Sequence, residues 1–218
     1  MIRTLAFDPP EWDIKEIKRY AQIRGADQSY EKLIGECISE AKPTLSYRVC
    51  YTVLDMLRAD DSITFGNITI NSNTIDRALG ASRQVLLFAA TIGAPFDRLL
   101  HRYSRIAPSK ALILQAIGAE RVESLCDAFC SRMNKELNLS QKALTRRVSP
   151  GYGDIPLMMQ KELFAVLDCP RKIGLTLDES LLMSPSKSVT AICGVTENKV
   201  CQEDQCSLCD KTDCAYRQ

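Results

Sequence analysis

Apolar side chains recur along this chain at helical intervals in some segments and at strand-like intervals in others. Apolar residues three and four positions apart predict helices over residues 12–24, 30–41 and 109–137. A further helix is expected after Pro95, because proline suits the first turn of a helix. Within the longest predicted helix, Gly118 and the alanine after it leave room for another element to approach closely.

Shorter apolar runs predict the strands. Residues 62–70 are rich in β-branched side chains around a Gly-Asn turn and predict a hairpin. Residues 83–91 predict a buried strand, and residues 188–195 predict a last strand. Residues 175–183 form a strand-like run that an acidic pair interrupts. Helices and strands alternate only partly along the chain. The pattern therefore predicts an α+β fold, with helices packed on a mostly antiparallel sheet.

Composition limits the size of the folded core and argues against some classes of binding partner. The 218 residues suffice for one substantial core, and 45% of them are hydrophobic. A formal net charge of +1 provides no overall field that would favour nucleic acid or an anionic membrane. We expect one main domain over residues 1–196 and a cysteine-rich tail over residues 197–218.

The first residues contain no apolar segment typical of an export signal, and the sequence contains no apolar run long enough to span a bilayer. We therefore expect a cytoplasmic protein, in which the ten cysteines are reduced thiols or metal ligands. Six of them are scattered among apolar neighbours and are predicted to be small buried hydrophobes without a special role. These are Cys37, Cys50, Cys126, Cys130, Cys169 and Cys193.

The other four cysteines crowd into the last eighteen residues and indicate a metal site. Four, two and four residues separate Cys201, Cys206, Cys209 and Cys214. Four thiolates bind Zn²⁺ tetrahedrally or hold an iron-sulfur cluster, and these spacings match neither pattern well enough to decide between them. Free thiols are the third alternative.

The most informative segment for function is the stretch from Arg147 to Asp154, which places a cation, a tight turn, an aromatic ring and a carboxylate within eight residues. Pro150 restricts the backbone, whereas Gly151 and Gly153 permit a positive φ and a close approach to the main chain. The segment is predicted to be a ligand clamp.

Several motifs together resemble the activation domain of cobalamin-dependent methionine synthase. They begin with Arg147-Val-Ser-Pro-Gly-Tyr152 and a helix near Pro156, and continue with an Asp-Glu-Ser element at residues 178–180 and Met-Ser-Pro at residues 183–185. The last of them is Ser-Val-Thr at residues 188–190. The resemblance covers most of residues 10–195 and is closest to short, free-standing members of the family.

The resemblance implies that the chain binds S-adenosylmethionine, so that inactive cob(II)alamin can be reduced and remethylated. A guanidinium can bind the ligand's carboxylate, and carboxylates can pair with its ammonium or sulfonium. Glycine leaves the backbone accessible to the adenosine, and an aromatic ring can stack on a cation or a flat base. The implied ligand residues are Arg147, Ser149, Gly151, Tyr152, Glu123 and Glu179.

The resemblance also implies a partner that carries cobalamin. The sequence has no Asp-x-His-x-x-Gly corrinoid motif, and its single histidine, His101, lies in a predicted helix. We expect a stand-alone subunit that docks on a cobalamin-carrying methionine synthase or a related corrinoid protein, with a flavodoxin or ferredoxin as electron donor. Two alternatives remain: a redox activator without S-adenosylmethionine, and an interaction module with zinc in its tail.

Overall fold

The structure is a computed structural model that describes residues 1–23, 28–59 and 61–197. Its centre is a sheet of seven strands with the order β4-β3-β2-β5-β9-β6, and β1 pairs with β2 beside this path. The pairings within the sheet are antiparallel. The strands are β1 (Arg3–Ala6), β2 (Arg48–Ala59), β3 (Ser62–Phe65), β4 (Ile68–Ile70), β5 (Gln84–Thr91), β6 (Ala143–Leu144) and β9 (Ser188–Thr196).

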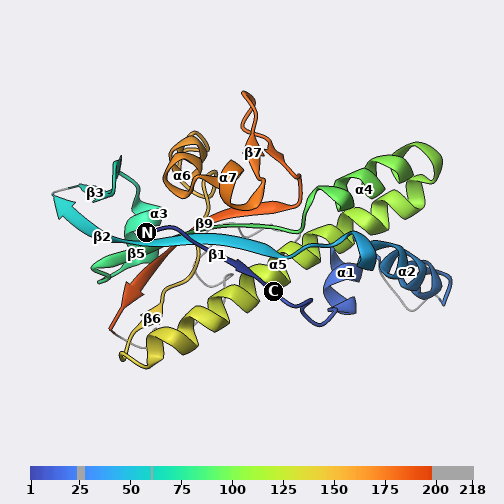
Figure 1. The fold of residues 1–218 in the computed structure, drawn as a ribbon, viewed down its shortest axis with the longest axis horizontal. Helices are drawn as coiled ribbons and strands as arrows, with labels where there is room; N and C mark the ends of the chain where they lie inside the picture. The colour runs from blue at the N-terminus through green and yellow to red at the C-terminus, as the bar shows by residue number, and fades with distance from the viewer. Residues whose placement is uncertain (24–27, 60, 198–218) are drawn as a thin grey trace.

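Helices cover both faces of this sheet. Figure 1 shows α6 and α7 on one face and the long α5 across the other, so that the sheet is the middle layer. A small hairpin, β7 (Thr176–Leu177) with β8 (Met183–Ser184), projects on the side of α6 and α7. The helices are α1 (Ile14–Tyr20), α2 (Gln28–Ala41), α3 (Asn73–Leu79), α4 (Ala94–Ile106), α5 (Pro108–Asn138), α6 (Met159–Leu167) and α7 (Cys169–Ile173).

The central strand β5 explains why one stretch of the sequence is continuously apolar. Successive side chains of a strand point to opposite faces. Leu86 and Phe88 accordingly join the core beneath α5, and Val85 and Leu87 join the core beneath α6 and α7. Because helices cover both faces, β5 is buried on both sides, as the sequence predicted.

A buried ion pair fixes the segment before α1. Arg121 is fully buried on α5, where it pairs with Glu120. Its Nη1 and Nη2 atoms donate hydrogen bonds to the carbonyls of Pro10 (2.7 Å) and Glu11 (2.6 Å). The guanidinium also lies 4.1 Å from the centre of the Trp12 ring. Burial of these charges is compensated by direct partners, and the N-terminal segment is held against α5.

The α+β class, the mostly antiparallel sheet and the hairpin over β3 and β4 are confirmed. The helix expected over residues 12–24 is shorter, because the Asp13 side chain accepts hydrogen bonds from the Lys15 and Glu16 amides and so caps a helix that begins at Ile14. The strand expected over residues 175–183 is wrong: only β7 and β8 are extended there, and a turn joins them.

In the described part of the chain, no helix is long and apolar enough to cross a membrane.

Candidate functional site

Arg147 lies where the edge of the sheet meets α5. The residues after β6 continue along β9, since the Thr145 amide donates to the Gly194 carbonyl (2.9 Å) and the Val148 amide to the Ile192 carbonyl (3.0 Å). Between these contacts, Arg147 pairs with two carboxylates of α5. Its Nη2 atom lies 2.6 Å from Glu123 Oε2, and its Nη1 atom lies 2.5 Å from Asp127 Oδ1.

This cluster is partly shielded from water. The Arg147 side chain is 19% exposed, whereas Glu123 is 42% exposed and Asp127 68%. Burial lowers the pKa of the Arg147 guanidinium, but Cys126, Asp127 and Glu123 outweigh it and raise this pKa above its usual value. The guanidinium is therefore always charged. Two of its five N–H groups are engaged by these carboxylates, which leaves donors for a further acceptor.

The predicted clamp follows Arg147 directly and forms a compact turn. The Tyr152 amide donates to the Ser149 carbonyl (3.1 Å), and the Gly151 amide donates to the Ile155 carbonyl (3.0 Å). Gly151 has a φ of 86°, a conformation that favours glycine. Tyr152 is 45% exposed, so its ring is available at the surface. The structure thus pairs Arg147 with Glu123, and this turn follows Arg147 along the chain.

Asp154 has a structural role that the sequence did not predict. Its Oδ2 atom accepts from the Asn73 amide (2.8 Å), and its Oδ1 atom accepts from the Thr74 amide (3.1 Å) and from the Ser72 hydroxyl (2.5 Å). The hydrogen bonds from Ser72 and Thr74 hold the pKa of the Asp154 carboxyl well below its usual range. The carboxylate of the clamp therefore ties the turn to the start of α3.

Glu179 lies apart from the other predicted ligand residues. It is exposed in the turn between β7 and β8, where the Leu182 amide donates to the Asp178 carboxylate (2.9 Å) and closes the turn. This hairpin packs with α6, whereas Glu123 belongs to α5 on the other face of the sheet. The acidic pair that interrupts the predicted strand-like run therefore lies on an exposed turn.

The close approach predicted at Gly118 is confirmed. A Cβ atom at this position would lie 2.6 Å from Phe96 Cε1 and 2.8 Å from Lys187 Cγ. The Lys187 side chain therefore crosses α5 above Gly118. Burial lowers the pKa of the Lys187 amine, and Asp97 opposes this effect.

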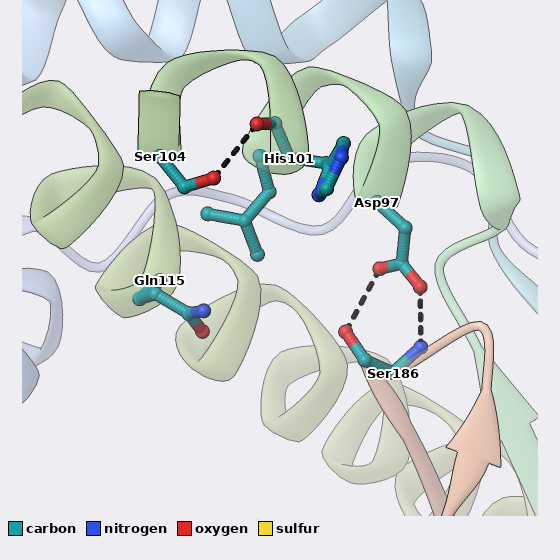
Figure 2. Close-up of a pocket in the computed structure, with 6 residues that line it drawn as sticks. Asp97, His101, Ser104, Gln115 and Ser186 are labelled. Atoms are coloured by element: carbon teal, nitrogen blue, oxygen red, sulfur yellow. Dashed lines mark hydrogen bonds between the residues drawn. The ribbon is translucent and has the colours of Figure 1, made fainter. Parts of the chain in front are cut away.

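A separate hollow of about 330 Å³ lies between α4, α5 and the segment before β9. Figure 2 shows its polar lining, in which Asp97 accepts hydrogen bonds from the Ser186 amide (2.6 Å) and hydroxyl (2.9 Å). His101 and Gln115 line the same hollow. None of the predicted ligand residues does, so this hollow and the Arg147 region are two distinct places on the surface.

The predicted metal ligands Cys201, Cys206, Cys209 and Cys214 lie outside the described residues. Among residues 1–23, 28–59 and 61–197, no three His, Cys, Asp or Glu side chains are arranged to hold a metal ion. The metal site of the tail stays a prediction.

Comparison with known proteins places this chain in a family. The sequence pattern of the family described as vitamin B12 dependent methionine synthase, activation domain, matches residues 52–201. This match covers more than half of the chain, and the chain belongs to this family. No protein of curated function matches it.

A solved structure supports the same conclusion for the fold. The chain is similar to the crystal structure of the MetH reactivation domain bound to AdoHcy, with a TM-score of 0.63 and 14% sequence identity. The alignment covers 89% of this chain and 78% of that one. At such low identity the likeness concerns the fold alone.

Proposed function

We propose that this chain binds S-adenosylmethionine beside Arg147 and presents its methyl group to a corrinoid that a partner protein carries. The pattern of charge supports this proposal. The ligand carries one carboxylate, one ammonium and one sulfonium, and the region around Arg147 offers one guanidinium and two carboxylates. Each charge of the ligand therefore has a counterpart of opposite sign within one cluster.

The remaining donors of Arg147 would bind the ligand's carboxylate, while Glu123 and Asp127 would face its ammonium and sulfonium. The turn at residues 149–152 would receive the adenosine, because Gly151 carries no side chain and the Tyr152 ring is exposed. Glu179 stays a predicted contact, from the separate hairpin. The family membership and the AdoHcy-bound relative of similar fold support the same ligand.

In the proposed reaction, one electron reduces cob(II)alamin on the partner, and its cobalt takes the methyl group as the S–CH₃ bond breaks and S-adenosylhomocysteine forms. The chain's own contribution is to bind and orient the methyl donor, for which no nucleophilic side chain is required. The proposed partner is a cobalamin-carrying methionine synthase or a related corrinoid protein. A flavodoxin or ferredoxin is the proposed electron donor.

The test is a calorimetric titration of the full chain with S-adenosylmethionine. We expect Arg147→Ala to weaken binding by about 2 kcal/mol, roughly 30-fold, because a charged hydrogen-bond partner is lost. The fold should persist in this variant, since Glu123 and Asp127 are exposed enough to be solvated. Arg98→Ala, which removes an exposed arginine of α4, is the matched control and should bind as the wild type does. Equal affinity of both variants would contradict the proposal.

The four cysteines of the tail favour a second candidate, a redox activator that passes electrons to a corrinoid partner. An iron-sulfur cluster on these thiolates would supply the low-potential electron, whereas zinc would make the tail an interaction module. A visible thiolate-to-iron absorption in protein purified without oxygen distinguishes the cluster from zinc and from free thiols. This candidate requires no S-adenosylmethionine, so the titration separates it from the first.

A further inference from the structure

The turn of the predicted clamp is anchored at both of its ends. At its start, the Val148 amide donates to the Ile192 carbonyl (3.0 Å), so Val148 is fixed to β9. At its end, the Asp154 carboxylate accepts hydrogen bonds from two amides and a hydroxyl at the start of α3. The Asp154 amide also donates to the Thr74 hydroxyl (3.4 Å). Residues 149–153 therefore span two fixed points, one on the sheet and one on a helix.

The turn and α3 are in direct contact at Gly153. A Cβ atom at Gly153 would lie only 2.3 Å from Thr74 Oγ1, and the φ of Gly153 is 60°. A residue with a side chain would be strained at this φ and would have no space here. The contact with α3 therefore extends from the Asp154 side chain to the backbone before it.

Helix α3 is itself held firmly by the core. Its Ile75 and Leu79 side chains are fully buried beneath α6 and α7. The Ser72 hydroxyl accepts a hydrogen bond from the Ile75 amide (3.1 Å) and caps the helix. The helix also packs against β9, where a Cβ atom at Gly194 would lie 3.1 Å from the Leu79 carbonyl oxygen. The turn is thus attached to an element that cannot shift easily.

We propose that Asp154 is a positioning residue for S-adenosylmethionine, because it fixes the turn that carries Gly151 and Tyr152 to α3. This inference rests on the proposed function, in which the turn receives the adenosine. Asp154 does not contact the ligand. It restricts the turn in the free protein, so that less conformational entropy is lost when the adenosine binds. By linkage, a ligand bound at the turn strengthens the contact with α3 by the same factor.

A titration with two ligands separates this role from that of Arg147. We expect Asp154→Ala to weaken the binding of S-adenosylmethionine and of 5′-methylthioadenosine by about tenfold each, a usual size for coupling between sites. The second ligand keeps the adenosine and lacks the carboxylate and the ammonium, so Arg147→Ala should weaken binding of the first ligand only. Asp154→Asn keeps one acceptor oxygen and should lie between Asp154→Ala and the wild type. Calorimetry measures each protein well below the midpoint of its thermal unfolding.

Asp13→Ala is the matched control. Asp13 caps α1 with the same kind of contact, because its Oδ1 atom accepts hydrogen bonds from the Lys15 amide (2.9 Å) and the Glu16 amide (3.0 Å). Loss of this cap should lower the stability of the protein. Both ligand affinities should stay at their wild-type values.

A second measurement needs no variant and decides the matter even if Asp154→Ala does not fold. In the wild type, S-adenosylmethionine should slow hydrogen exchange at the Asn73 and Thr74 amides by about tenfold, because both donate to Asp154 and linkage is reciprocal. The two amides that donate to Asp13 should keep their exchange rates.

The outcomes distinguish this inference from the proposed function. Wild-type affinities in Asp154→Ala, an equal loss in Asp13→Ala, or unchanged exchange at Asn73 and Thr74 would overturn the inference alone. Binding of S-adenosylmethionine without any binding of 5′-methylthioadenosine, or a loss in Asp154→Ala confined to the first ligand, would overturn it as well. A wild type that binds neither ligand would contradict the proposed function and this inference with it.

Discussion

Arg147 joins two parts of the fold through its backbone and its side chain. Its backbone lies beside β9, where Val148 bridges to Ile192, and its side chain reaches Glu123 and Asp127 on α5. The guanidinium is mostly buried and stays charged, so its two partners are needed to offset the loss of water. A ligand carboxylate would bind the N–H groups of Arg147 that Glu123 and Asp127 do not engage.

Asp154 has a comparable role for the turn that follows. Because its pKa is lowered in the folded protein, Asp154 stabilises the fold above the ordinary carboxyl pKa of about 3.9. The stabilisation is lost as the pH falls below that value and through the lower pKa of the folded state. Asp154→Asn should therefore lower the midpoint of thermal unfolding at neutral pH, and the difference from the wild type should shrink in acid.

Asp61→Asn is the matched control, because Asp61 is exposed in the turn between β2 and β3. Thermal melts of the three proteins between neutral pH and about pH 2 make the comparison, in the range where carboxyl groups titrate. A difference between Asp154→Asn and the wild type that is constant over this range would show that its carboxylate charge does not matter.

At this scale the sequence predicted the residues better than their contacts. Arg147, Glu123 and Gly151 were predicted from residue type and motif, and the structure pairs Arg147 with Glu123. The pairing of Arg147 with Glu123 spans 24 positions and depends on how α5 packs against β9, which no local pattern specifies. The cap formed by Asp154 likewise joins segments about 80 residues apart.

At the scale of the elements, long periodic segments were predicted well and short ones poorly. The long apolar stripe of α5 and the continuous apolar run of β5 carry strong signals, and both elements are found as expected. The hairpin of β7 and β8 has only two residues in each strand, so turn geometry dominates its sequence. Its exposed acidic turn therefore resembled an interruption within a strand.

The glycines of α2 and α5 provide a test of close packing between elements. Gly118→Ala should destabilise the protein by about 1–2 kcal/mol, because the clash with the buried Phe96 ring exceeds the gain in helix propensity. Gly35→Ala is the matched control within α2, where an added Cβ meets no atom within 4 Å. It should stabilise the protein by about 0.5–1 kcal/mol. Urea unfolding measures both, and a stabilised Gly118→Ala variant would contradict the packing described here.

For the whole molecule, the class of fold followed from the pattern, but the order of its strands did not. Strand β9 lies between β5 and β6, and β2 pairs with β1 over its first part and with β3 over its last. Such pairings join distant segments, and the burial of each strand is compatible with several orders. The resemblance carried by residues 147–190 indicated a family without giving this strand order, and the match of the family's sequence pattern over residues 52–201 confirms the family.

The most direct test of the proposed ligand site is a structure of the full chain in complex with S-adenosylmethionine. We expect the ligand's carboxylate within hydrogen-bond distance of Arg147, its sulfonium facing Glu123 and Asp127, and its adenosine beside the turn that contains Tyr152. A ligand bound instead in the hollow lined by Asp97 and His101, or no ligand at saturating concentration, would contradict the assignment of the site.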